Sequence, residues 1–300
     1  MQVSHPDKVI FPTAGITKGE VVAHYERVGE LMLSFLSGRP LTLQRFPKGI
    51  GAKGFMQKNA GKYFPESIER FPVEKRDGEF THYSVVHQAA DLAYLANQNT
   101  VTFHMWTALA TRPNHPDWMV LDLDPEADDL EGVRFATGAV CDLLSEFELE
   151  GFVVATGSKG FHVWLRIDGS ADFGQVSLAT RALAGLTAAR HPDQLTTEFL
   201  KKNRNGRVFV DWLRNTGIAT VVVPFSLRPR PGAPCAVPLL RSELAIARPD
   251  GWTINTLDDR LAIDTDHQPQ HLPVDDIVAA ARAAGVDLDT AHDRFGRNSS

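Results

Sequence analysis

The chain has 300 residues, of which 43% are apolar, and a formal net charge of −6 at pH 7. This length and apolar content exclude a disordered chain and predict one compact domain with a substantial core. The sequence has no apolar run long enough to span a bilayer and no secretory leader, so we expect a cytoplasmic, nucleoid-associated protein with no membrane partner. Cys141 and Cys235 lack metal-ligand spacing and are expected to be reduced core thiols.

The charges are unevenly distributed along the chain. Residues 243–300 contain eleven acids against five lysines or arginines, so this extension carries the whole net charge. Residues 199–242 hold eight lysines or arginines against one acid, Asp211. This segment is a candidate anion-binding surface, although a solvated basic loop has the same composition. Within the single domain 1–300 we therefore distinguish an N-terminal α/β part (1–106), a catalytic core (107–242) and the acidic extension.

Hydrophobic spacing and turn residues predict the elements of the N-terminal part. Thr17 is the expected N-cap of a first helix that stops at Gly38. We also expect strands at 41–46, 83–86 and 101–106, a helix at 88–97, and a Gly- and Lys-rich loop at 47–62.

The central part of the chain follows the order β-α-β-β-α-β. Its expected elements are strands at 118–125, 152–155, 161–167 and 208–210, with helices at 129–147 and 174–189. This order is typical of a ferredoxin-like or RNA-recognition-like sheet, which carries helices on one face and leaves the other free for a ligand. We therefore predict an α+β fold in which this core is extended by the N-terminal α/β unit and by strands near 219–223. A helix at 273–285 is expected to dock on the body, and 294–300 to be frayed.

The strand at 118–125 ends in two carboxylates, Asp122 and Asp124. In a strand of period two both side chains lie on one face, ~7 Å apart. Two like charges on an apolar strand repel each other unless a cation lies between them. Oxygen ligands at this spacing suit Mg²⁺ or Mn²⁺, although an acidic strand-to-loop transition without metal is also compatible with these residues.

A glycine turn follows, with the sequence Thr156-Gly157-Ser158-Lys159-Gly160. Glycines let backbone N–H groups approach an anion, while Lys159 and the two hydroxyls add donors, so the turn is suited to phosphates. An ordinary hairpin is the alternative, but the nearby carboxylate pair favours the phosphate site. His162 is expected to bind a phosphate oxygen, with general-acid and half-buried roles also open. His104 is either a core or a site residue.

Asp211 ends the last strand of the core and is either an ion-pair partner or a third metal ligand. The idealised topology runs the first and last strands antiparallel and does not by itself bring Asp211 to Asp122. Arg228 and Arg230 lie in a proline-stiffened segment that could direct a guanidinium at a triphosphate, or have a structural role. Together, three acids, a phosphate turn and trailing arginines suit two-metal phosphoryl or nucleotidyl transfer.

With these motifs the chain resembles the polymerase (primase-polymerase) module of bacterial non-homologous end-joining DNA ligases, in the archaeo-eukaryotic primase superfamily. It is similar to the stand-alone relatives that lack a ligase domain. The match covers about 7–245. Its landmarks are Asp7-Lys8-Val9-Ile10-Phe11-Pro12, Thr17-Lys18, Arg45-Phe46-Pro47, Gln57-Lys58, Phe103-His104-Met105-Trp106, Asp122-Leu123-Asp124-Pro125, Gly157-Ser158-Lys159-Gly160-Phe161-His162, Val210-Asp211-Trp212-Leu213 and Ser226-Leu227-Arg228-Pro229-Arg230-Pro231-Gly232-Ala233-Pro234.

The resemblance implies a template-dependent nucleotidyltransferase that adds one or a few ribonucleotides to a DNA primer, in gap filling or end joining. It implies that Asp122, Asp124 and Asp211 hold two Mn²⁺ or Mg²⁺ ions and form the catalytic set with His162. The residues expected to bind nucleotide are Phe55, His104, Thr156, Ser158, Lys159, His162 and Arg228. The residues expected to contact DNA are Lys8, Lys18, Arg45, Lys58, Arg204, Arg214 and Arg230, with Lys8 and Lys18 at a 5′-phosphate and Phe55 stacking on a base.

The sequence departs from the family pattern at three positions. Met56 replaces the second stacking aromatic, Gln44 stands where lysine is frequent, and Arg214 stands where glutamine is usual. We expect these changes to affect binding of the template strand and the preference between ribo- and deoxyribonucleotides rather than catalysis. The segment 74–78 mimics part of a ligase adenylation motif and is interpreted as a loop.

The expected partners are gapped or broken duplex DNA with a 5′-phosphate, an NTP or dNTP, and DNA-end-binding and ligase repair proteins, with the chain acting as a monomer. The alternatives are a metal-dependent nuclease, a sugar-nucleotide transferase, and a non-catalytic module that binds DNA ends or gaps.

Overall fold

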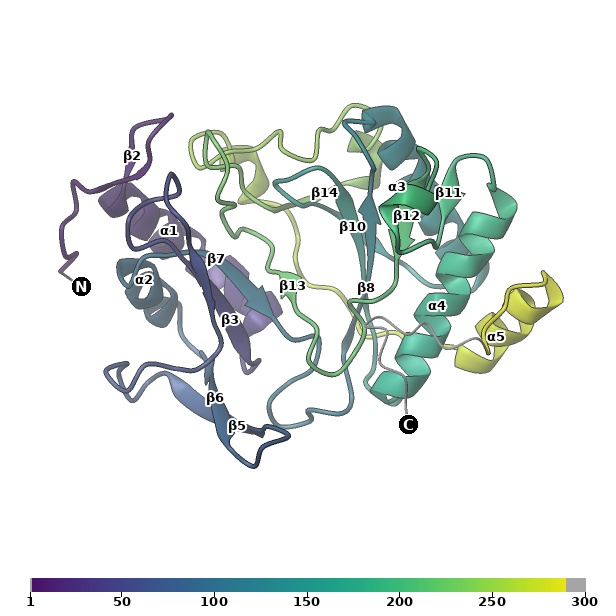
Figure 1. Cartoon of the computed structure of the whole chain (residues 1–300), viewed down its shortest axis with the longest axis horizontal. Helices are drawn as coiled ribbons and strands as arrows, with labels where there is room; N and C mark the ends of the chain where they lie inside the picture. The colour runs from purple at the N-terminus through teal and green to yellow at the C-terminus, as the bar shows by residue number, and fades with distance from the viewer. Residues whose placement is uncertain (1, 290–300) are drawn as a thin grey trace.

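The computed structural model describes residues 2–289, which fold into two six-stranded sheets and one two-stranded ribbon. Figure 1 shows the N-terminal sheet with helices α1 and α2 on the left and the second sheet with α3, α4 and α5 on the right. None of the helices in this described part of the chain combines the length and apolarity needed to cross a membrane.

The N-terminal half begins with the ribbon β1 (Val9–Phe11) and β2 (Ile16–Thr17), which leads into helix α1 (Lys18–Leu36). Thr17 caps this helix as predicted, because its hydroxyl accepts from the Glu20 N–H while the Glu20 carboxylate accepts from the Thr17 N–H. The elements that follow are β3 (Leu41–Arg45), β4 (Phe55–Gln57), β5 (Glu69–Glu74), β6 (Phe80–Val85), α2 (Ala89–Asn97) and β7 (Thr100–Met105). Their sheet has the order β13-β7-β3-β6-β5, with β4 added on β3.

The second half contains β8 (Trp118–Asp124), α3 (Leu130–Glu146), β9 (Phe152–Ala155), β10 (Phe161–Arg166), α4 (Phe173–Arg190), β11 (Leu195–Thr196), β12 (Val208–Asp211), β13 (Val221–Val222), β14 (Val237–Leu239) and α5 (Val274–Ala283). The sheet order is β11-β12-β8-β10-β9-β14. Its four inner strands form the antiparallel arrangement expected of a β-α-β-β-α-β unit, and α3 and α4 pack against them. The predicted α+β class and core order are confirmed.

The sequence did not predict the short strands β1, β2, β11 and β14, and three further strands also differ from the prediction. The loop expected at 47–62 contains β4, and β5 was not predicted. The two-residue β13 joins the N-terminal sheet, where it pairs with β7, rather than the core. All three are short or exposed strands with little hydrophobic alternation, so the sequence carries a weak signal for them.

The two halves meet at a cluster of aromatic rings. Phe35 of α1 stacks on Trp118 of β8 at 5.8 Å between centroids, and Trp118 meets Trp164 of β10 edge to face at 5.5 Å. Next to these rings, Arg39 is 2% exposed and forms a bidentate pair with Asp117, with Nη2 2.8 Å from Oδ2. Large rings and a buried, fully paired guanidinium fix one half against the other.

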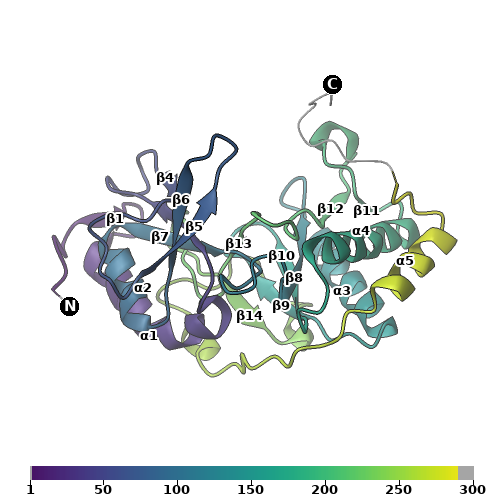
Figure 2. The ribbon, with the colours of Figure 1, turned by 90° about the horizontal axis from the view of Figure 1, so that it is seen from below.

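The acidic extension runs along the underside of both halves and ends in α5, which packs on α4 as expected (Figure 2). Arg27 of α1 pairs with Asp258 at 2.7 Å, and Arg260 pairs with Glu243 at 2.8 Å. Cys141 and Cys235 are buried free thiols, as expected. The fraying expected at 294–300 lies outside the described residues.

Candidate active site

Three neighbouring strands place two acids and a histidine in one row. Asp122 of the central strand β8 lies directly opposite Asp211 of β12 on one side and opposite His162 of β10 on the other. Residues that oppose each other in antiparallel strands project from the same face of the sheet. The register of β12 therefore supplies the convergence of Asp211 on Asp122 that the topology alone leaves open.

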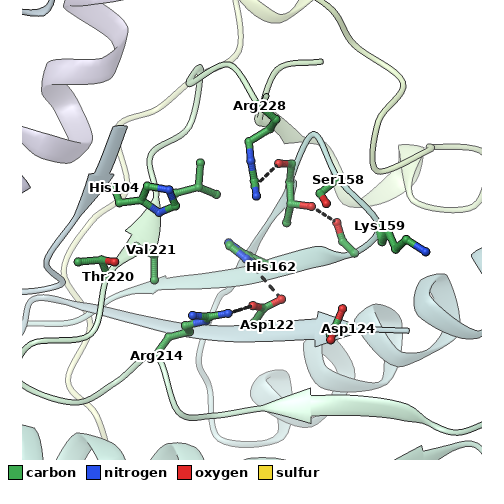
Figure 3. Close-up of a pocket in the computed structure, with 13 residues that line it drawn as sticks. His104, Asp122, Asp124, Ser158, Lys159, His162, Arg214, Thr220, Val221 and Arg228 are labelled. Carbon is green, nitrogen blue, oxygen red and sulfur yellow. Dashed lines mark hydrogen bonds and ion pairs between the residues drawn. The ribbon is translucent and has the colours of Figure 1, made fainter. Parts of the chain in front are cut away.

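Asp122 is the electrostatic centre of this row. Its Oδ1 lies 3.4 Å from His162 Nε2, and its Oδ2 accepts from Arg214 Nε at 3.2 Å and Nη2 at 3.1 Å (Figure 3). Burial by itself raises the pKa of Asp122, but the charges and hydrogen bonds of His162 and Arg214 outweigh burial and hold this pKa below its usual value. Asp122 is therefore a carboxylate at all physiological pH values.

The other two acids have different surroundings. Asp124 lies toward the open end of the pocket, with Oδ2 3.5 Å from Arg204 Nη1. Asp211 is buried, accepts from the Leu213 N–H at 2.8 Å, and has Oδ2 3.8 Å from Arg214 Nε. Asp122 and Asp124 line the pocket, whereas Asp211 lies behind Arg214.

The glycine turn forms one wall of the pocket, as the β9–β10 hairpin. Thr156 Oγ1 donates to the Gly160 carbonyl at 2.7 Å, which closes the turn. A Cβ on Gly160 would collide with the Leu123 carbonyl oxygen, so only glycine lets the hairpin approach β8 this closely. Lys159 lines the pocket but extends away from Asp122 and pairs with Asp128 at 3.0 Å (Figure 3).

His104 and Arg228 form the wall opposite Asp122 (Figure 3). Burial, with the nearby charges of Arg228, Arg214 and His162, lowers the pKa of His104 to about 3, so this imidazole is neutral at physiological pH. Burial lowers the pKa of Arg228 to about 10, which leaves the guanidinium charged. Arg228 Nε and His162 Nδ1 are buried without a hydrogen-bond partner in the described part of the chain, so both atoms are available to form hydrogen bonds with a ligand.

Comparison with known proteins connects this site to a family. Residues 17–268 match the family model described as the LigD primase-polymerase domain. The chain belongs to this family. This result confirms the resemblance inferred from the sequence.

The family relatives include the multifunctional non-homologous end joining DNA repair protein LigD of Mycobacterium tuberculosis, 32% identical over 81% of this chain and 33% of the relative. LigD of Pseudomonas aeruginosa is 31% identical over 87% of this chain and 31% of the relative. The solved polymerase domain of Mycobacterium tuberculosis ligase D in complex with DNA superposes with a TM-score of 0.77, at 27% identity over 97% of this chain and 99% of that domain. The chain spans about a third of the length of these curated relatives.

Asp122, Asp124 and Asp211 do not converge on a common point at which a metal ion could bind. No group of three or more His, Cys, Asp or Glu side chains within residues 2–289 is placed to hold a metal ion. Each acid instead lies near an arginine: Arg214 is bound to Asp122 and close to Asp211, and Arg204 faces Asp124. The Arg214 guanidinium is hydrogen-bonded to Asp122 and lies 3.8 Å from Asp211, so it supplies positive charge to both carboxylates.

The residues expected to contact DNA do not form one surface. Lys8 and Lys18 line a separate small cavity at the N-terminal end, where Lys8 Nζ lies 3.1 Å from Asn99 Oδ1 and Lys18 Nζ lies 2.6 Å from Ser4 Oγ. Burial and the charge of Lys8 lower the pKa of Lys18. Two ammonium groups facing one cavity form a suitable anion site.

Phe55 and Lys58 are exposed on and beside β4, whereas Arg45 is largely buried. The Arg45 guanidinium lies 5.6 Å from the Phe55 ring centroid and donates to Tyr63 Oη at 3.0 Å. Arg45 thus supports the exposed ring of Phe55 rather than presenting an open charge.

The basic segment 199–242, a candidate anion-binding surface, divides between exposed side chains and arginines that fold inward. Arg204 is 3% exposed, lies 4.2 Å over the Phe209 ring and donates to the Glu198 and Phe199 carbonyls. Arg214 and Arg228 line the pocket, and Arg230 is half-buried. Counting charges along a sequence does not tell which of them fold inward, so the composition could not distinguish these arginines from exposed ones.

Sequence reasoning missed two contributors to the site. Asn215 is fully buried and binds the backbone of Val120 in β8, two residues before Asp122. The segment Thr220 to Val222 forms part of the pocket wall next to His104. Asn215 carried no recognisable signal beyond its closeness to Asp211 in the sequence, because its role depends on a long-range contact.

Proposed function

We propose that the chain is a template-dependent nucleotidyltransferase that adds one or a few nucleotides to a DNA primer, in gap filling or end-joining repair. The observation that carries the proposal is the row Asp211, Asp122 and His162 in a chain of the LigD primase-polymerase family. Asp122 and His162 of this row line one pocket with the cations Lys159 and Arg228. Acids on one wall and cations on the other suit transfer of a phosphoryl group from a triphosphate.

The triphosphate of an NTP or dNTP is proposed to lie against the glycine turn. The unpartnered Arg228 Nε supplies a buried donor, His162 Nδ1 is a second buried polar atom without a described partner, and Ser158 and Lys159 line the same pocket. Lys159 would exchange Asp128 for phosphate, an exchange that costs little because the pair with Asp128 is exposed. Neutral His104 can donate or accept a hydrogen bond without adding charge.

Two divalent cations, Mn²⁺ or Mg²⁺, are proposed to be held by Asp122, Asp124 and Asp211. The all-carboxylate donor set fits these hard ions, and the guanidinium bound to Asp122 supports a cation at this position. When bound, such ions would activate the primer hydroxyl and stabilise the departing pyrophosphate. The chain's own part is to keep Asp122 ionised and to hold the donors at fixed places on one face of the sheet.

The proposed nucleic-acid partner is gapped or broken duplex DNA. A related polymerase domain was solved in complex with DNA, which supports this choice. The cavity at Lys8 and Lys18 is proposed to take a 5′-phosphate, and the exposed Phe55 ring to stack on a base. The chain is proposed to act as a monomer together with DNA-end-binding and ligase repair proteins.

The test is primer extension on labelled gapped DNA with Mn²⁺ and NTPs. Asp122→Asn removes one ligand charge, and a loss of about 4 kcal/mol in transition-state stabilisation corresponds to a roughly thousandfold lower rate. Binding of gapped DNA should persist in this variant. Asp142→Asn, an exposed acid on α3 paired with Arg241, is the matched control and should extend the primer normally.

The product pattern separates the reaction classes. Products longer than the primer support a polymerase, shorter products support a nuclease, and unchanged DNA supports a sugar-nucleotide transferase. If Asp122→Asn extends the primer as fast as the wild type, the acids at this site do not perform the reaction.

A non-catalytic module that binds DNA ends or gaps is the second candidate. It is favoured by one observation, that the described residues include no acid cluster ready to hold a metal. Calorimetric titration with Mn²⁺ distinguishes the two, because a binding module has no need of the ion. DNA binding without Mn²⁺ binding would support this second candidate.

A further inference from the structure

Arg214 occupies the middle of the acidic row. It lies three residues after Asp211, on the turn that follows β12, and its fork contacts Asp122 Oδ2 through Nε at 3.2 Å and Nη2 at 3.1 Å. The same Nε is 3.8 Å from Asp211 Oδ2. Figure 3 shows the guanidinium beside Asp122, with the contact between them drawn as a dashed line. One positive group thus serves two carboxylates on adjacent strands.

Arg214 reduces the electrostatic repulsion between Asp122 and Asp211. Asp211 is buried and Asp122 is half-buried, and two carboxylates directly opposite each other repel where little water screens them. Burial alone lowers the pKa of Arg214, but the charges of Asp122 and Asp211 more than compensate and raise it. The guanidinium therefore supplies the positive charge that a divalent cation would supply at the same acids.

The Arg214 side chain is also free to move away from Asp122 and Asp211. Its side chain is 44% exposed, whereas that of Arg204, the other arginine at a site acid, is 4% exposed and is bonded to two backbone carbonyls. The turn that carries Arg214 is held by the buried Asn215, so a rotation of the Arg214 side chain into the pocket needs no change of backbone.

We propose that Arg214 is an internal counter-ion that occupies the cation position of the acidic row, and that a divalent metal ion binds only by displacing it. This inference rests on the proposed function, because the displacing ion is the one proposed for catalysis. It explains why the acids are not arranged around a ready metal position although their chemistry suits one. Arg214 then sets the metal affinity of the site without being a metal ligand itself.

The experiment is a calorimetric titration of the full chain with Mn²⁺ in the absence of nucleotide and DNA. Arg214→Gln removes the competing charge and should bind Mn²⁺ about tenfold more tightly than the wild type, which is about 1.4 kcal/mol. Arg214→Lys keeps the charge but loses the fork, and should lie between the two. Arg190→Gln removes an exposed arginine that pairs with Glu146 on the helical side of the sheet, and should match the wild type.

Thermal unfolding provides a second readout. Without metal, Arg214→Gln leaves the two acids without their shared cation and should melt below the wild type. With saturating Mn²⁺ the rise in Tm should be larger for this variant than for the wild type, because the ion replaces a missing charge instead of displacing one that is present. If Arg214→Gln does not fold, Arg214→Lys carries the same comparison.

The outcomes separate the two claims. If the wild type binds Mn²⁺ and Arg214→Gln binds it equally or more weakly, the counter-ion role is wrong while the metal site stands. If Asp122→Asn binds Mn²⁺ as well as the wild type does, the ion lies elsewhere and the displacement is also refuted. If none of the proteins binds Mn²⁺, both the displacement and the proposed metal centre are refuted.

Discussion

Substitution of Asn215 tests whether its hydrogen bonds to β8 hold the candidate active site in place. It is fully buried in the turn after β12, and its side chain takes the place of a strand partner for β8. The amide oxygen accepts from the Val120 N–H at 2.8 Å, while the amide nitrogen donates to the Val120 carbonyl at 2.7 Å and to the Trp212 carbonyl at 2.9 Å. These bonds join the backbone near Asp122 to the turn that carries Arg214.

Asn215→Ala leaves one buried N–H and two buried carbonyls without these partners. At about 1 kcal/mol for each hydrogen bond, the expected loss in the free energy of unfolding is roughly 3 kcal/mol. This is a large share of the total of about 5 to 15 kcal/mol that typical domains possess. Asn215→Asp keeps the shape and the acceptor but cannot donate, so it should be at least as destabilising.

Urea unfolding followed by tryptophan fluorescence measures this loss, and Asn255→Ala, at an exposed asparagine, is the control. Primer extension on the folded variant should also slow by up to about a hundredfold, because a small displacement of Asp122 is enough to disturb the reacting geometry. An unfolding free energy within 0.5 kcal/mol of the wild type, taken as roughly the range of neutral surface substitutions, would refute the reasoning.

Two further predictions concern the N-terminal half. Burial lowers the pKa of His24 to about 4, and since the unfolded chain takes up the proton near pH 6.5, stability should fall as pH drops through this window by roughly 3 kcal/mol. His24→Gln should remove that part of the pH dependence in urea titrations, the exposed His82→Gln should not, and identical profiles for the wild type and His24→Gln would contradict the assignment. Lys18→Ala should reduce, roughly tenfold, the preference for gapped DNA with a 5′-phosphate over the same DNA without it in fluorescence anisotropy. An unchanged ratio would place the phosphate site elsewhere than in the cavity shared with Lys8.

The sequence predicted the elements whose local signal is strong. The alternation of 118–124 indicated that Asp122 and Asp124 share a face, and both line the pocket. Thr17 and Glu20 form the capping box that begins α1. The glycine turn at 156–160 was assigned to the site because it follows the acidic strand in one compact unit, and its residues line the same pocket as Asp122. The first two predictions depend on neighbours within a few residues, and the third depends on the order of the elements along the chain.

The remainder of the site depends on long-range register, which local patterns do not encode. A shift of β12 by one residue would turn Asp211 to the opposite face, and no residue near Asp211 reveals which register is adopted. The sequence likewise did not predict that the Arg204 side chain points inward, because the Phe209 ring and two backbone carbonyls hold its guanidinium there. Arg214 was noted as a departure from the family pattern, but its contact with Asp122 needed the fold.

Arg228 connects the N-terminal sheet to the glycine turn of the second sheet, at the pocket. The segment before it is bonded to β7 of the N-terminal sheet, where the Thr102 hydroxyl donates to the Leu227 carbonyl at 2.7 Å and the Phe103 N–H donates to Ser226 Oγ at 2.8 Å. Arg228 itself donates from Nη1 to the Thr156 carbonyl of the second sheet at 2.8 Å.

The guanidinium of Arg228 therefore bridges a loop anchored on one sheet and a turn that belongs to the other. Its approach to Asp122 depends on the aromatic and ionic contacts that join the halves, among them the buried pair of Arg39 and Asp117. The N-terminal half, through His104, is then part of the pocket as well as a proposed surface for DNA. A fragment that contains only the second sheet would keep the acidic row but lose the wall formed by His104 and the anchor of Arg228, so it should not transfer nucleotides.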